Sequence, residues 1–120
     1  MAHGLLRFLH MQTEGLRHLE AAKVETPIGT LNDVVVVSKA DVPIGKLEGI
    51  IVDPAEKHVR FYVVESRDWF RTHRYLVPDA PHHIDWNRRA LQVEMDEAAL
   101  SKLPELRDDE FPPFSTGDLG

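Results

Sequence analysis

The stretch from Gly45 to Glu65 limits the possible folds of this chain more than any other part of the sequence. Two runs rich in aliphatic and aromatic residues, GKLEGIIV at 45–52 and HVRFYVVE at 58–65, flank the segment DPAEK at 53–57. Asp and Pro favour a reverse turn, so the two runs, nearly equal in length, should pair as an antiparallel hairpin. Side chains alternate between the two faces of a strand. The expected faces of the second strand are Val59, Phe61 and Val63 on one side, and Arg60, Tyr62 and Val64 on the other.

Further strand signals flank this hairpin at intervals of about ten residues. The run DVVVVS at 33–38 is almost entirely β-branched, RTHRYLV at 71–77 ends before a proline, and shorter apolar runs occur at 84–86 and 90–94. Turn residues separate these runs, and strands do not alternate with long helices. The pattern predicts an all-β fold, namely a small six-stranded antiparallel β-barrel.

Both ends of the chain carry helical signals. Residues 5–22 repeat leucine at the spacing of one helix face, at Leu5, Leu9, Leu16 and Leu19. Near the other end, DEAALSKL at 96–103 predicts a short C-terminal helix with Asp96 as its N-cap. The expected organisation is an N-terminal helical segment at 1–24, a barrel domain at 25–104 and a flexible, acidic and Pro-rich tail at 105–120.

The inward positions of the expected strands define a candidate core. Its members are Leu47, Ile51, Val59, Phe61, Val63, Leu76, Leu91 and Val93. A chain of 120 residues builds only a small core, because short chains bury a smaller fraction of their surface than long ones. We therefore expect the protein to associate with a further chain, most simply as a homodimer.

Charge and composition disfavour several kinds of function. The formal net charge of −6 gives no overall attraction to nucleic-acid phosphates, and the absence of cysteine leaves no thiolate for metal binding or nucleophilic attack. Neither a phosphate-binding glycine loop nor the Gly-x-Ser-x-Gly elbow of serine hydrolases occurs. No apolar run is long enough for a transmembrane segment, and no signal peptide is recognisable. The absence of cysteine fits a cytoplasmic location best.

Taken in order, these pieces resemble the PRC-barrel family. The matching features, which span roughly residues 30–104, are Gly45-Lys46-Leu47 after a turn, the Asp53-Pro54 hairpin turn, the strand Arg60-Phe61-Tyr62-Val63-Val64, Leu76-Val77-Pro78 and a last hairpin from Ile84 to Val93. Members of this family are small β-barrels. They include the cytoplasmic domain of the photosynthetic reaction-centre H subunit, the C-terminal domain of a ribosome maturation factor, and many short free-standing proteins.

The resemblance implies docking or assembly without catalysis and without a cofactor, because the family shares no catalytic residues and its members look like adaptors for other proteins. In the ribosome maturation factor a Tyr-Tyr-Trp stretch precedes the barrel. Residues 24–29 of this chain contain no aromatic residue, which speaks against a ribosomal role. The resemblance does not name the protein partner.

The candidate interaction surface comprises Arg67, Trp69, Phe70, Arg71 and Arg74. Aromatic residues and arginines carry much of the binding energy in protein interfaces, so we expect a protein to bind here. The same residues allow two other interpretations. Trp69 could fold back and close the barrel end, or Trp69 and Arg74 could bind single-stranded RNA by stacking and phosphate contacts, which the acidic net charge disfavours.

A further alternative is a barrel that binds a metal or small ligand at His83 and Asp85. These two residues stand two positions apart on an expected strand and so share one face, and imidazole and carboxylate are good ligands for zinc. The adjacent His82 should point to the opposite face, which weakens the cluster.

The tripeptide Pro-Ile-Gly occurs twice, at 27–29 and at 43–45. The residues that follow the two copies do not align, so we predict no internal repeat. In the second copy, Gly45 is expected to permit a close approach or a backbone conformation that a side chain would forbid.

Overall fold

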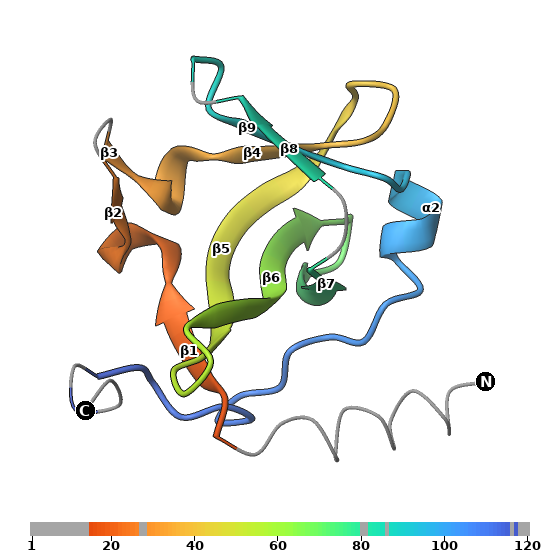
Figure 1. Cartoon of the computed structure of the whole chain (residues 1–120). Helices are drawn as coiled ribbons and strands as arrows, with labels where there is room; N and C mark the ends of the chain where they lie inside the picture. Colours follow the sequence, from red (N-terminus) through yellow and green to blue (C-terminus); the bar gives the residue numbers. More distant parts are fainter. Residues whose placement is uncertain (1–14, 27–28, 80–81, 86, 116, 118–120) are drawn as a thin grey trace.

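The computed structural model describes residues 15–26, 29–79, 82–85, 87–115 and 117, and within them the protein consists mainly of short strands (Figure 1). The all-β class is confirmed. The strands are β1 (Arg17–Glu20), β2 (Glu25–Thr26), β3 (Gly29–Thr30), β4 (Val35–Val37), β5 (Pro43–Asp53), β6 (His58–Arg67), β7 (Thr72–Pro78), β8 (His82–Asp85) and β9 (Ala90–Val93). The helical elements are the 3₁₀ turns η1 (Ala21–Lys23) and η2 (Leu31–Asp33) and the helix α2 (Glu97–Leu100).

One mixed sheet organises the molecule. Its strand order is β7-β6-β5-β4-β9-β8, and β1 pairs with β5 beside this path. Its neighbouring strands are antiparallel except β4 and β9, which run parallel with Val36 opposite Leu91. The end strands β7 and β8 do not pair with each other in the described residues, so the curled sheet stays open there (Figure 1). The prediction of a six-stranded antiparallel barrel is therefore wrong in strand number, in one pairing direction and in closure.

The hairpin predicted from the sequence is present as β5 and β6. Its register runs from Asp53 opposite His58 to Lys46 opposite Glu65, with irregularities that bend the pair after Leu47 and after Ile51. A Cβ atom on Gly45 would lie 2.6 Å from Val64 Cγ1 and 2.7 Å from the Glu65 carbonyl oxygen, so only glycine fits between β5 and β6 at this point.

The two Pro-Ile-Gly copies use their glycines differently. Gly45 permits the close approach within the β5–β6 hairpin, whereas Gly29 has a φ of +126°, a backbone conformation that residues with a side chain rarely adopt. This difference agrees with the prediction that the two copies do not form an internal repeat.

Apolar side chains fill both faces of the β5–β6–β7 part of the sheet. The first core cluster, enclosed by the curled sheet, includes Val36, Ile44, Leu47, Val64, Tyr75, Val77, Leu91, Val93 and Leu100. The second core cluster, on the opposite face, comprises Leu16, Ile51, Phe61, Val63, Leu76, Leu106 and Phe111. The alternation predicted for β6 is confirmed, because Val64 belongs to the first cluster and Val63 to the second. The candidate core residues are buried except Val59, which is half-buried.

The helix expected over residues 5–22 is wrong for its described part. Residues 17–20 form β1, with Arg17 opposite Val52 and Glu20 opposite Gly49. Gly15 has a φ of +82°, which is incompatible with a right-handed helix, and pairing with β5 then supplies the backbone hydrogen bonds. The rest of the expected helix, residues 5–14, lies outside the described residues.

The C-terminal segment 104–114 covers the second core cluster. At β7 the Leu106 N–H donates to the Arg74 carbonyl oxygen over 2.7 Å, and at β1 the Phe114 N–H donates to that of His18 over 2.8 Å. Leu106 and Phe111 are 8% and 5% exposed. The sequence predicts a flexible tail from residue 105 onward, whereas in the structure Leu106 and Phe111 pack on the outer face of the sheet.

The helix α2 begins where the sequence predicts. The Asp96 carboxylate accepts a hydrogen bond from the Ala99 N–H over 2.8 Å, as an N-cap should, and Leu100 packs into the first core cluster. The helix ends at Leu100, earlier than expected. None of the helices in the described ranges is long and apolar enough to cross a membrane.

Candidate interaction site

The turn between β6 and β7 displays two aromatic side chains in solvent. Trp69 is 97% exposed and Phe70 is 93% exposed. The Asp68 carboxylate Oδ1 accepts hydrogen bonds from the N–H groups of Phe70, over 2.8 Å, and Arg71, over 2.9 Å. The Asp68 N–H in turn donates to the Arg71 carbonyl oxygen. These bonds form an Asx-type turn, which fixes the backbone while leaving both rings in solvent. Residues 67–71 are called the aromatic turn below.

His73 ties the aromatic turn to the C-terminal segment. Its Nε2 lies 2.6 Å from Asp68 Oδ2, and its Nδ1 lies 3.0 Å from Glu105 Oε1. The ring also stacks on Tyr75, with 5.5 Å between centroids. An ionised carboxylate only accepts hydrogen bonds, so both contacts are hydrogen bonds only when both ring nitrogens carry a proton. The arrangement therefore suits the imidazolium form.

The pKa shifts follow this geometry. The hydrogen bonds to Asp68 and then to Glu105 raise the pKa of His73. The pKa of Asp68 is strongly lowered, first by the Arg71 N–H and next by the bond from His73. Burial raises the pKa of Glu105, but the hydrogen bonds from His73 and Arg71 outweigh it and lower that pKa overall. All three shifts favour the charged forms, so the imidazolium and the two carboxylates stabilise one another on one side of the turn.

The structure places the five predicted surface residues in two different situations. Trp69 and Phe70 stand free on the turn, which excludes the interpretation that Trp69 closes the end of the sheet in this structure. Arg67 is exposed and forms no ion pair with any described residue. By contrast, Arg71 contacts Glu105 over 3.1 Å and Arg74 contacts Asp108 over 2.7 Å.

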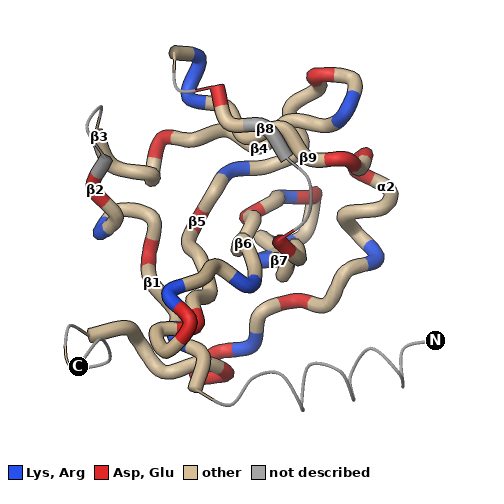
Figure 2. Tube along the Cα trace, in the orientation of Figure 1, with Lys and Arg blue, Asp and Glu red and all other residues tan. Residues whose placement is uncertain are grey.

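These ion pairs weigh against RNA binding. A phosphate would have to displace Glu105 from Arg71 and Asp108 from Arg74, and both carboxylates would then repel it. Figure 2 shows acidic and basic positions interspersed along the segment that follows α2, rather than one continuous basic stripe. The geometry favours the aromatic rings, and not the arginines, as the binding element.

The alternative metal site at His83 and Asp85 gains no further ligand from the described residues. The Asp85 carboxylate accepts hydrogen bonds from the N–H groups of Asn87 and Arg88, and so caps the turn between β8 and β9. The side chain of His83 lies outside the described part. Within that part, no group of three or more His, Asp or Glu residues could hold a metal ion.

A groove that sequence reasoning missed lies beside α2. One wall is the loop at 38–40, and the other is formed by Glu94, Met95, Asp96 and Ala99; the space has a volume of about 600 Å³. Its surface is mainly apolar, with the two acidic side chains on the second wall and Lys39 on the first. This space is called the α2 groove below.

The first wall of the α2 groove is fixed by Ser38. This buried hydroxyl oxygen accepts hydrogen bonds from the N–H groups of Ala40 and Val42, each over 3.2 Å. The Gln92 side-chain amide donates to the Ser38 and Lys39 carbonyl oxygens from β9. Ser38 therefore holds the loop in shape.

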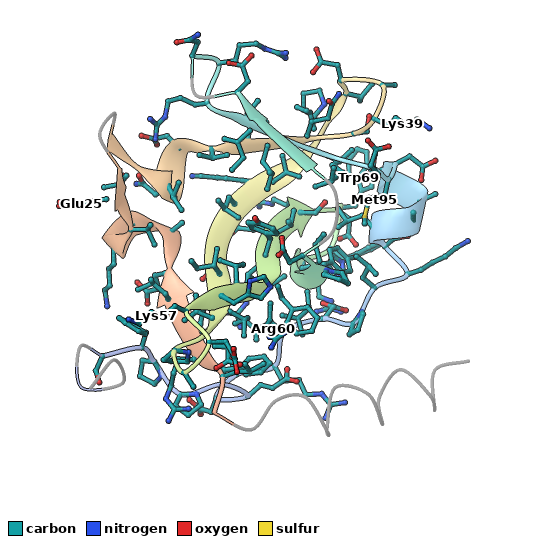
Figure 3. The ribbon with its side chains drawn as sticks, in the orientation of Figure 1. Glu25, Lys39, Lys57, Arg60, Trp69 and Met95 are labelled. Carbon is teal, nitrogen blue, oxygen red and sulfur yellow. The ribbon has the colours of Figure 1, made fainter. Side chains whose placement is uncertain are left out.

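The aromatic turn and the α2 groove lie at the same end of the sheet. Loop 38–42 leads directly into β5, whose Lys46 is opposite Glu65, just before β6 enters the turn. Strands β4 and β9 are parallel, with Val37 opposite Gln92, so both leave the sheet at this end. In Figure 3, Trp69, Lys39 and Met95 lie on the same side of the molecule.

Neither models of known protein families nor curated proteins gave a match to this sequence. The geometry of the aromatic turn and the residues around it are therefore the basis for inferring a function.

Proposed function

We propose that this chain is a non-catalytic protein-interaction and assembly module of the PRC-barrel type, which acts in the cytoplasm, forms a homodimer and docks through its aromatic turn. The observation that carries the proposal is the pair Trp69 and Phe70, adjacent and almost fully exposed on a turn fixed by hydrogen bonds. Large apolar side chains grouped in solvent mark binding surfaces in proteins.

The rigidity of the turn supports a docking role. Binding a flexible loop costs conformational entropy, and a loop already held in shape avoids most of that cost. Here Asp68 holds the backbone and His73 holds Asp68, so the rings are presented from a fixed base. The polar groups of Asp68 and His73 already bond within the chain. The affinity for a partner would therefore come from the exposed aromatic surface.

The PRC-barrel assignment is supported by the order of elements. The β5–β6 hairpin turns at Asp53-Pro54, β7 ends at Pro78, and β8 and β9 form the last hairpin, in the succession on which the resemblance depends. The proposed cytoplasmic location is supported by the lack of cysteine.

The experiment that tests the docking role compares the proteins that co-purify with three forms of the chain. These are the wild type, the double variant Trp69→Ala/Phe70→Ala, and the control Glu56→Ala, whose exposed position lies in the turn at the opposite end of the β5–β6 hairpin. We expect the double variant to keep its thermal stability and lose partners that the control retains. An unchanged set of partners in the double variant would refute docking through the aromatic turn.

A further inference from the structure

We infer that the partner of the aromatic turn is a second copy of this chain, in which Trp69 and Phe70 enter the α2 groove. The inference depends on the proposed function and adds to it the site into which the two aromatic rings insert. Two copies would exchange their turns reciprocally, so each subunit provides one turn and one groove.

The α2 groove has suitable size and chemistry for this occupant. Its volume of about 600 Å³ exceeds that of one aromatic side chain, and Ala40, Met95 and Ala99 provide apolar contacts. Methionine is adaptable and packs well against aromatic rings. The ring of Trp69 does not occupy the groove of its own chain, because it is 97% exposed.

Charge complementarity gives the orientation. Arg67 precedes the two rings, is exposed and forms no ion pair with the described residues. The acidic side chains Glu94 and Asp96 stand on one wall of the groove, and Glu94 forms no ion pair with the described residues either. When the rings enter the groove, Arg67 lies toward this acidic wall. Charges at the rim of an interface fix its register and exclude wrong partners.

The shared end of the sheet permits a closed dimer. In a two-fold symmetric interface the same surface of both subunits takes part, so a turn and its receiving groove must lie on one face. The aromatic turn and the α2 groove meet this condition, because β4, β6 and β9 all leave the sheet at the same end. A turn and groove on opposite ends would instead produce open chains of subunits.

The four rings supply at least half of the area that a small specific interface needs. A tryptophan or phenylalanine buries about 150 to 250 Å² each, so the four rings of a dimer remove about 600 to 1,000 Å² from water. The lining of the two grooves is smaller than this, so the flanking residues of the two turns and the rims of the grooves complete the roughly 1,200 Å² at which specific interfaces begin.

A charge exchange between subunits tests the inference. Arg67→Glu places like charges against Glu94 in both contacts of the dimer, and Glu94→Arg does the same against Arg67. We expect each variant alone to dimerise about tenfold more weakly than the wild type. In an equimolar mixture, the turn of the Arg67→Glu chain meets the groove of the Glu94→Arg chain, which restores opposite charges. The second contact joins a native turn to a native groove, so the mixed dimer recovers wild-type affinity in sedimentation velocity.

The outcomes separate this inference from the proposed function. A mixture that associates no better than its components, or a dimer whose affinity is unchanged in Trp69→Ala/Phe70→Ala, would overturn the reciprocal exchange. If that double variant still loses co-purifying proteins other than the chain itself, the docking role stands and only the groove assignment fails. Thermal unfolding of each variant checks that the fold is intact.

Discussion

The imidazole of His73 lies 2.6 Å from the carboxylate of Asp68, and this contact joins a β7 side chain to the residue that shapes the aromatic turn. The other ring nitrogen reaches Glu105, in the C-terminal segment. Because the two partners are carboxylates, the imidazolium form makes both bonds, whereas the neutral ring can donate only one. The position of Trp69 and Phe70 is thus linked to the charge of a single histidine.

The first prediction concerns the pKa of His73. Nuclear magnetic resonance titration of the ring should give a pKa above the ordinary value of about 6.5. Asp68→Asn should lower that pKa, because it removes the charged acceptor that contributes most to the shift. Glu56→Gln, at an exposed site in the opposite turn, should leave it unchanged. A His73 that titrates alike in the wild type and Asp68→Asn would show that the contact does not persist in solution.

The second prediction is the pH dependence of stability. A group whose pKa is raised by folding stabilises the fold below its unfolded pKa, and this contribution disappears as pH rises through its folded pKa. Asp68 and Glu105 have lowered pKa values, so both stay ionised at mildly acidic pH, and their contribution disappears only below the ordinary carboxyl pKa of about 4. The destabilisation by His73→Gln should therefore be larger at mildly acidic pH than at alkaline pH, as measured by urea unfolding. A destabilisation that grows toward alkaline pH would contradict the ion-pair account.

The third prediction concerns Gly45. In Gly45→Ala the new methyl group would collide with Val64 Cγ1 at 2.6 Å and with the Glu65 backbone at 2.7 Å. Overpacking of this kind costs about 1 to 3 kcal/mol of unfolding free energy. The matched control is Gly117→Ala, where the nearest atom, Ser115 Oγ, would lie 3.7 Å away. Equal stability of the two variants in denaturant titration would mean that β5 and β6 do not approach as described.

The fourth prediction concerns the C-terminal segment. Leu106→Ala should destabilise the protein by about 2 to 5 kcal/mol, because it leaves a cavity in the second core cluster. Val42→Ala, at a side chain 54% exposed, should cost much less. If the segment were instead a loose tail, the Leu106 variant would unfold at the same denaturant concentration as the wild type.

Local signals in the sequence were sufficient for the central hairpin and for α2. Asp53-Pro54 and the alternation in residues 58–65 predict β5 and β6, and Asp96 predicts the start of α2. Long-range pairing decided the rest. Leu16 and Leu19 fit a helical spacing, but β1 forms because the edge of β5 is available to it. The parallel pairing of β4 with β9 joins residues more than fifty positions apart, and no local sequence pattern predicts it.

In the candidate site too, local sequence signals predict one part and long-range contacts determine the rest. Residue type made Trp69 and Phe70 candidates for binding, but it left open whether Trp69 would instead close the end of the barrel. Their exposure depends on Asp68 and on a His73–Glu105 contact across 32 positions. The α2 groove could not be found from the sequence, because its walls come from residues 38–40 and 94–99 and become neighbours only through the sheet.

The most direct test of the assembly account follows the environment of Trp69 itself. The chain has two tryptophans, so Trp86→Phe leaves Trp69 as the only one. As protein concentration rises through the micromolar range, we expect its fluorescence emission to move to shorter wavelength and its quenching by acrylamide to fall, as the indole leaves water. Emission and quenching that stay those of a fully exposed indole at every concentration would contradict homodimerisation through the aromatic turn.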